Sequence, residues 1–329
     1  MTATTSENFR LQKILTAVTV VLFIVKIMAW YYTNSVAILT DALEYTINVI
    51  SGFIGLYSLY LSSKPRDYNH PYGHGKAEFL SAAVEGTLML VSGLIIIYEA
   101  MNNLRNPHAI DKLDFGILLV AATAAVNYFT GFLAVKTGKR NNSLALIATG
   151  KHMQSDTYAT IGIVVGLGII YFTHMLWVDS IVSLVFALII MISGYKIMRT
   201  SIAGIMDEAD DKLLTQVVET INSARHTNWM DMHNMRIIKY GSILHLDCHL
   251  TVPWYLTVNE AHKEMDTVET IVKKGFGESV ELFIHTDGCM DFSCAICTKT
   301  DCNVRKEAFR EKIHWTVANI STNQKHRLN

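Results

Sequence analysis

The chain has 329 residues, of which 50% are hydrophobic and 17% are charged, and its formal net charge is −1. This composition is too apolar for an ordinary soluble protein of this size, and the absence of a basic excess argues against a nucleic-acid partner. The apolar residues concentrate between positions 14 and 198, whereas the rest has the composition of a soluble domain. We therefore expect a membrane protein with a separate soluble part.

Six apolar segments are long enough to cross a hydrocarbon layer of about 30 Å. Each should be a helix, because lipid offers backbone groups no hydrogen-bond partners. After a cytosolic N-terminus at residues 1–13, a transmembrane domain at 14–198 holds these helices at residues 14–32, 36–61, 79–101, 115–135, 144–172 and 177–198. Lysines and arginines in the termini and loops are strongly biased to one side, which places both ends of the chain in the cytoplasm.

The second and fifth spans carry polar side chains at helical spacing. Asp41, Glu44 and Asn48 fall on one face of the second span, and His152 and Asp156 share a face of the fifth. Ionisable groups inside a membrane are costly and usually mark ion or proton pathways. The alternative is that the fifth helix ends near this pair, which then contacts interfacial water.

Two helices that each offer two ligands can surround one divalent cation. Nitrogen and oxygen ligands suit Zn²⁺, and a mixed set also admits Fe²⁺, Mn²⁺, Co²⁺ or Cd²⁺. Metal and protons then compete for the histidine and the carboxylates. The predicted transport site is Glu44, Asn48, His152 and Asp156. Asp41 is a further candidate, as a ligand, as a group behind the ligands or as an interfacial cap.

The loop after the second span contains Asp67, His70 and His74. On spacing alone, an exposed second metal site and a solvated loop with ordinary histidines are equally compatible with these residues.

The soluble part at residues 199–288 shows alternating helical and strand patterns. Helical periodicity at 207–225 and 257–275, and strands at 233–240, 243–252 and 279–285, give an αββαβ order and a two-layer α+β domain. A lone histidine here would usually be structural, and the sequence does not bring its ligand-type residues together. Five of them lie on or just past these elements and could hold zinc, also across a dimer interface: His233, His249, His262, His285 and Asp287.

The tail at residues 289–329 carries four of the five cysteines, at Cys289, Cys294, Cys297 and Cys302. A CxxC pair flanked by two further cysteines at equal spacing favours a metal–thiolate site. The alternatives are a redox pair and a loose tail of reduced thiols.

These motifs together resemble the cation diffusion facilitator family, most of all its bacterial zinc and ferrous-iron efflux branch. The resemblance covers residues 10 to about 289, and its carriers are Ile24–Thr33, His70–Glu78, His152–Asp156 and Ile284–Asp287. It implies a six-helix transmembrane bundle, a cytosolic ferredoxin-like domain and a homodimer in the cell (inner) membrane. The family's transport, loop and cytosolic zinc sites match the three residue sets given above.

The resemblance implies an exporter of Zn²⁺ or Fe²⁺ that works as a metal/proton antiporter and is regulated by cytosolic zinc. Its expected partners are a second copy, the lipid bilayer and protons. Asn48 departs from the family pattern because it replaces an ionisable ligand with a neutral carbonyl oxygen. Two alternatives follow: an exporter of Mn²⁺ or Co²⁺, and a metal-sensing membrane protein that has lost transport. An enzyme is not expected, because the sequence shows no nucleophile–base pair, phosphate loop or cofactor motif.

Overall fold

The computed structural model describes residues 3–33, 36–105, 114–173, 177–241, 243–277 and 279–328. The chain divides into two compact units, Met1–Met206 and Asp207–Asn329.

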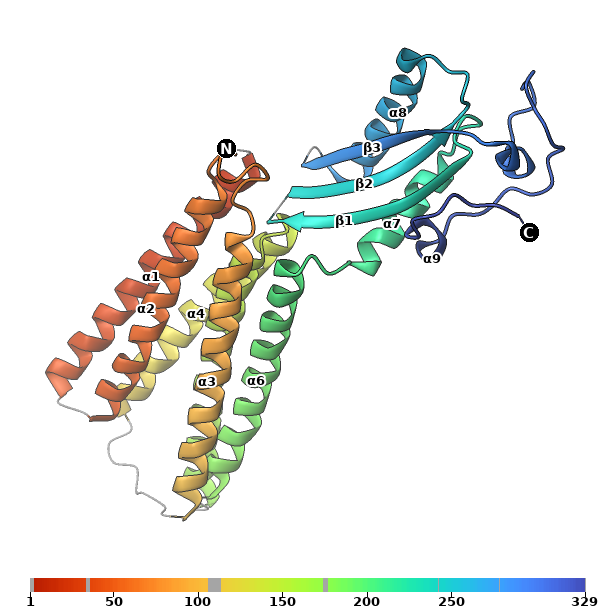
Figure 1. Ribbon diagram of the computed structural model, residues 1–329. Helices are drawn as coiled ribbons and strands as arrows, with labels where there is room; N and C mark the ends of the chain where they lie inside the picture. The colour runs from red at the N-terminus through yellow and green to blue at the C-terminus, as the bar shows by residue number, and fades with distance from the viewer. Residues whose placement is uncertain are drawn as a thin grey trace. The chain divides into compact units, whose positions relative to one another are not determined.

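The first unit is helical. Its helices are α1 (Ala3–Thr33), α2 (Val36–Ser62), α3 (Ala77–Arg105), α4 (Asp114–Arg140), α5 (Leu144–Thr173) and α6 (Trp177–Ile205) (Figure 1). Within the described residues, three stretches are long and apolar enough to span a membrane: Ser6–Met28, Ala77–Asn102 and Ser180–Ile205. The predicted spans in α2, α4 and α5 run partly through side chains outside the described set.

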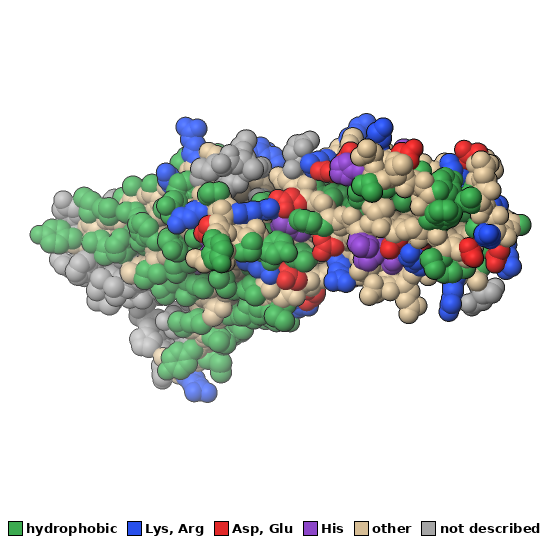
Figure 2. Space-filling view, turned by 45° about the horizontal axis from the view of Figure 1, so that its top comes forward, with side chains coloured by type: hydrophobic (Ala, Val, Ile, Leu, Met, Phe, Trp, Pro, Cys, Tyr) green, Lys and Arg blue, Asp and Glu red, His purple; other side chains and the backbone are tan. Residues whose placement is uncertain are grey.

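The outer face of this unit is apolar. Large hydrophobic side chains such as Val21, Leu94 and Leu188 are more than half exposed. Figure 2 shows how hydrophobic side chains cover this unit. A surface of this kind suits lipid and would be a liability in water.

Glycines let pairs of helices approach closely. A Cβ atom added to Gly150 of α5 would lie 2.7 Å from the carbonyl oxygen of Gly131 in α4, and one added to Gly131 would lie 2.8 Å from the carbonyl oxygen of Gly150. Gly86 of α3 and Gly194 of α6 form a second reciprocal contact, at 2.8 Å in each direction. Small residues allow such backbone contacts within a membrane. The first contact fixes α5 against α4 two residues before His152.

The second unit has the predicted αββαβ order. It consists of α7 (Asp211–Ser223), β1 (Asp231–Tyr240), β2 (Ile243–Val252), α8 (Val258–Phe276) and β3 (Val280–Gly288). Strand β2 lies in the middle, antiparallel to β1 and parallel to β3, and α8 makes the crossover that a parallel pair requires. Helices α7 and α8 cover one face of the sheet (Figure 1). The core between them includes Val218, Val268 and Leu246.

The cysteine-containing tail belongs to this unit. It forms a short 3₁₀ helix, η1 (Asp291–Ile296), and a single helical turn, α9 (Val317–Ile320). Trp315 and Ile320 are fully buried in the same core as the sheet and helices. The guanidinium of Arg225 lies 3.7 Å from the centre of the Trp315 ring. The tail therefore contributes to the hydrophobic core.

Candidate metal centres

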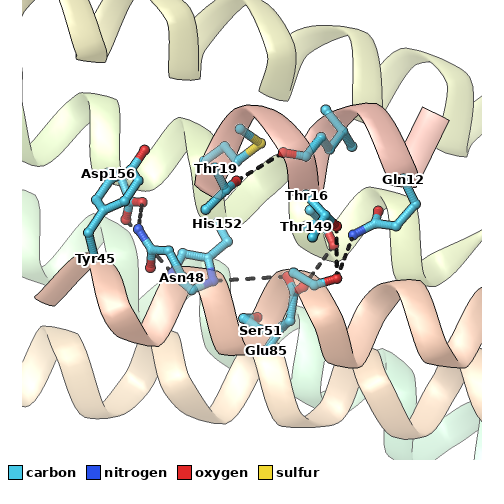
Figure 3. A pocket seen from close by; sticks show the side chains of 13 residues that line it. Gln12, Thr16, Thr19, Tyr45, Asn48, Ser51, Glu85, Thr149, His152 and Asp156 are labelled. Carbon is cyan, nitrogen blue, oxygen red and sulfur yellow. Dashed lines mark hydrogen bonds and ion pairs between the residues drawn. The ribbon is translucent and has the colours of Figure 1, made fainter. Parts of the chain in front are cut away.

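A cavity of about 170 Å³ lies among the helices of the first unit, and its lining includes Asn48, His152 and Asp156. A smaller hollow of about 20 Å³ shares these three residues and adds Glu85 and Thr149 (Figure 3). Three of the four residues predicted for the transport site therefore line one space. The side chains of Glu44 and Asp41 lie outside the described residues.

Asn48 and Asp156 face each other between α2 and α5. The Asn48 amide nitrogen donates a hydrogen bond of 2.6 Å to Asp156 Oδ2. On the other side, His152 Nε2 lies 3.8 Å from Asp156 Oδ1, one turn earlier on the same helix. His152 is 7% exposed, so its ring is available mainly to groups inside the cavity.

Glu85 of α3 adds a carboxylate to this space. The residue spacing within α2 and α5 could not predict a group from a third helix. Glu85 is 2% exposed and accepts a hydrogen bond of 2.7 Å from Thr149. Its Oε2 lies 4.0 Å from Nδ1 of His152, and Figure 3 shows the two side chains directed toward each other. The described residues thus place two acidic groups, Asp156 and Glu85, on opposite sides of one histidine.

A lysine also reaches the cavity wall. Lys26 of α1 is 5% exposed, and its ammonium lies 4.1 Å from the centre of the Tyr45 ring. The Tyr45 hydroxyl in turn donates a hydrogen bond of 2.7 Å to Asn127 of α4. These residues line the larger cavity beside Asn48, and their spacing along the chain does not predict that they meet.

The loop between α2 and α3 brings Asp67, His70 and His74 together. The Asp67 carboxylate lies 3.0 Å from His70 Nδ1 and 3.4 Å from His74 Nε2, and all three ligand atoms lie within 4.8 Å of one another. The hydrogen bond from His70 lowers the pKa of the Asp67 carboxyl, which keeps it ionised. The geometry fits a small metal site open to water.

In the second unit, Asp287 gathers histidines from the three strands. Its carboxylate lies 3.5 Å from His233 Nε2, 3.2 Å from His249 Nδ1 and 3.8 Å from His285 Nε2. Burial lowers the pKa of His233, so its ring is neutral and able to bind a metal. His262 on α8 is not brought to this group: its Nε2 lies 3.6 Å from Asp266.

Asp231 and two residues of the tail extend this cluster. Asp231 Oδ2 lies 3.6 Å from His233 Nδ1, and the same carboxylate accepts hydrogen bonds from the ring and the backbone of His326. Burial alone would raise the pKa of Asp231, but these hydrogen bonds lower it. Lys325 Nζ lies 3.6 Å from Asp287 Oδ1. Sequence spacing could not reveal these partners, because His326 lies 95 residues from Asp231 and Lys325 lies 38 residues from Asp287 along the chain.

Comparison with known proteins gives two matches that together cover most of the chain. Residues 13–206 match the cation efflux transmembrane domain, and residues 209–289 match the cation efflux protein cytoplasmic domain. The chain belongs to the cation diffusion facilitator family. It is a divalent metal cation efflux transporter. Its helical domain is embedded in a membrane and is followed by a cytoplasmic domain.

Similar family members are named for different metals, or for none. The uncharacterized transporter sll1263 of Synechocystis sp. is 31% identical over 247 residues, which are 75% of this chain and 80% of the relative. The cadmium, cobalt and zinc/H⁺–K⁺ antiporter of Bacillus subtilis is 26% identical over 75% of this chain and 79% of the relative. The manganese efflux system protein MneS of the same organism is 27% identical over 77% of this chain and 87% of the relative.

The four tail cysteines of this transporter come after the matched cytoplasmic domain or at its last residue. Cys289 directly follows β3, Cys294 lies in η1, and Cys297 and Cys302 follow that helix. All four are free thiols, and Cys297 is buried. The residues described here do not place any three of these sulfur atoms within 4.8 Å of one another.

Proposed function

We propose that this transporter exports Zn²⁺ or Fe²⁺ in exchange for protons. The observation that carries the proposal is the shared cavity, in which Asn48, His152 and Asp156 converge from α2 and α5. Asp156 and Glu85 supply two negative charges that match the two positive charges of the ion. Glu44, one turn before Asn48 on α2, stays a proposed ligand of the same site.

Competition between metal and protons couples the two fluxes. A metal ligand must be deprotonated, whether it is a neutral imidazole or an ionised carboxylate. When the metal leaves His152 and Asp156, protons are the ions able to replace it on both side chains. The exchange therefore follows from the chemistry of the same groups that hold the cargo.

Loading requires a local rearrangement at Asn48. An amide coordinates a hard cation through its oxygen, whereas the Asn48 nitrogen now bonds Asp156. The ion has to replace this hydrogen bond before both side chains can bind it. Asn48 is thereby both a weak ligand and a group that holds the metal-free carboxylate in place.

The cluster around Asp287 is proposed to bind regulatory zinc. Neutral histidines and a carboxylate are suitable ligands for Zn²⁺, and one ligand atom from each of His233, His249 and Asp287 lies within 4.8 Å of the other two. We propose a homodimer in the inner membrane with both termini in the cytoplasm, in which His262 of a second copy could complete a shared site. The loop residues Asp67, His70 and His74 are proposed as an accessory site.

A second candidate cargo is Mn²⁺ or Co²⁺. The neutral oxygen of Asn48 favours a harder ion than a site made of histidine and carboxylates alone. Competition between Zn²⁺, Fe²⁺, Mn²⁺ and Co²⁺ for one transport system decides between these cargoes.

The test is metal uptake into inside-out vesicles that contain the full chain, with and without an imposed pH gradient. We expect uptake that the gradient accelerates and that Asp156→Ala abolishes, whereas Asp301→Ala, at an exposed tail carboxylate, leaves it unchanged. Transport by Asp156→Ala at the unaltered rate would contradict the site. Zinc binding without flux of any of these metals would identify a sensor that has lost transport.

A further inference from the structure

We propose that Cys289, Cys294, Cys297 and Cys302 hold one metal centre through four thiolates in the cytoplasmic unit. This centre is separate from the transport cavity and from the cluster around Asp287. Its role is to fix the tail against the sheet. The four thiolates would bind a thiophilic metal, either as a single Zn²⁺ or as an iron–sulfur cluster.

The four cysteines lie within 14 residues of chain, and backbone hydrogen bonds hold three of them in place. The backbone N–H of Cys289 donates 2.9 Å to Val252 O, which ties the first cysteine to the end of β2. Cys294 and Cys297 are joined by a backbone hydrogen bond at the end of η1.

A backbone hydrogen-bond donor points at one of these sulfur atoms. The backbone N–H of Lys306 donates to Cys294 Sγ at 3.4 Å. A thiol is a weak acceptor, whereas a metal-bound thiolate is a good one whose properties depend on such bonds. The Cys294 sulfur therefore has the surroundings expected of a thiolate ligand.

Arg305 organises the loop that carries the cysteines. Its guanidinium donates to the carbonyl oxygens of Cys294, Cys297 and Lys299, at 2.9, 3.0 and 2.6 Å. These bonds hold residues 294–299 in a turn. The positive charge of Arg305 also offsets the net negative charge that four thiolates and one divalent metal would carry.

The spacing of the sulfur atoms leaves two centres to be distinguished. With Zn–S bonds of about 2.3 Å, four sulfurs in a tetrahedron lie roughly 3.8 Å apart. No three of these four sulfurs lie within 4.8 Å in the described residues. A single zinc therefore requires the sulfurs to close in, whereas a [4Fe–4S] cluster, which puts one iron behind each thiolate, accepts a wider array.

The end of the tail reaches the histidine cluster. Beyond the cysteines the chain returns to the sheet, where Asn234 N donates 2.7 Å to Thr322 O and Lys325 reaches Asp287. A metal centre at the start of the tail closes this loop from one side, and the buried Trp315 closes it from the other. Loss of the metal should therefore loosen the segment between Cys289 and Trp315.

The test uses the full chain purified without oxygen. Metal and acid-labile sulfide are measured first, and the protein is then stripped and loaded with Co²⁺, which shows intense near-ultraviolet charge-transfer bands only with thiolate ligands. Cys297→Ser is compared with Cys248→Ala, since Cys248 lies in β2, outside the cluster. Cleavage of the tail by trypsin reports on the segment that the centre fixes.

We expect the unaltered protein to contain either one thiolate-bound zinc or iron with matching sulfide, and either result supports the site. Cys297→Ser should lose that metal and the cobalt bands and gain tryptic cleavage after Arg305 or Arg310, while Cys248→Ala keeps both metal and bands. If Cys297→Ser does not fold, Cys302→Ser replaces it. Full cobalt bands in Cys297→Ser or Cys302→Ser, a metal content that neither of these two variants lowers, or disulfides among the four cysteines would overturn the proposal. Zinc flux in vesicles should persist in Cys297→Ser, so this test stands apart from that of the transport site.

Discussion

The amide nitrogen of Asn48 lies 2.6 Å from Oδ2 of Asp156, so a neutral donor on α2 occupies the carboxylate that α5 offers to a metal. If the Asn48 amide oxygen faced Asp156 in place of the nitrogen, the lone pairs of the two side-chain oxygens would repel each other in a low-dielectric space. The hydrogen bond removes that conflict in the metal-free protein. It also means that metal entry is a substitution, in which the ion displaces an N–H group.

Asn48→Asp should change both metal preference and pH dependence. A carboxylate at this position repels Asp156 in the empty site and adds a charge in the loaded one, so the site gains an anionic ligand and a proton competitor. We expect metal affinity to rise by about tenfold, in the range typical for changes of groups that support a metal, and uptake to decline more steeply as the pH falls. Competition among Zn²⁺, Mn²⁺ and Co²⁺ in vesicles at several pH values measures both effects. Asn48→Ala, which removes the amide without adding a charge, is the control, and an unchanged order of metals would contradict the assignment.

Glu85→Gln should weaken metal binding at the transport site. The substitution keeps the shape and the bond to Thr149 but removes the charge that lies 4.0 Å from His152. Ligand support of this kind is worth about 10–100-fold in metal affinity, so the metal concentration for half-maximal uptake should rise by at least about tenfold. The matched control is Glu78→Gln, since Glu78 is equally buried in α3 but bonds Ser143 and Ser62 away from the cavity. Equal uptake curves for the two variants would exclude a role for Glu85.

Periodicity explains what the sequence could predict. Runs of apolar residues and the 2.0 and 3.6 repeats indicated the helical domain and the αββαβ order, because each element buries one face. They also placed His152 and Asp156 on one face of α5, since four residues make about one turn. The same reasoning could not join Glu85 to His152 or Asp231 to His326, because those contacts depend on how separate elements pack. The assignment of Glu44, His262 and the tail cysteines as metal ligands stays a prediction.

Gly150→Ala should destabilise the helical domain. The added Cβ would lie 2.7 Å from the carbonyl oxygen of Gly131 and 2.8 Å from the Val135 side chain, so α5 must move away from α4. Overpacking of this kind costs about 1–3 kcal/mol, and the shift would displace His152 as well. Thermal unfolding in detergent, together with vesicle uptake, measures the effect. At Gly52 the nearest atom to an added Cβ is 3.4 Å away, an ordinary contact. Gly52→Ala should therefore be tolerated, and similar losses in both variants would rule out this explanation.

Asp287→Asn should abolish zinc binding by the cytoplasmic cluster. Asp287 is the carboxylate that His233, His249 and His285 share, and a neutral amide neither balances the ion's charge nor binds it as tightly. Titration of the full chain with Zn²⁺ should lose one class of sites, while uptake persists without its activation by cytosolic zinc. Glu281→Gln is the control, because Glu281 pairs with His245 on the same sheet without joining the cluster. Retained zinc in Asp287→Asn would place the regulatory site elsewhere.

Asp210→Ala should weaken the cytoplasmic unit in a pH-dependent way. Asp210 caps α7 by accepting a hydrogen bond of 3.1 Å from Leu213 N, and it pairs with Lys239 at 2.5 Å. Burial alone would raise the pKa of Asp210, but the bonds from Lys239 and Leu213 hold it below the ordinary value of 3.8. A lowered acid pKa stabilises the fold above the unfolded-state value, and this contribution is lost as the pH falls through the lowered folded-state value.

The loss of the cap should therefore cost about 1 kcal/mol at neutral pH and progressively less below the ordinary value of 3.8. Urea unfolding at neutral and acidic pH, followed by the fluorescence of the buried Trp229 and Trp315, measures the difference. Asp211→Ala is the matched control, since Asp211 is exposed and stands one position inside the helix. An equal cost for both substitutions, or a cost for Asp210→Ala that does not shrink in acid, would show that the cap and its lysine partner do not stabilise α7 as the geometry indicates.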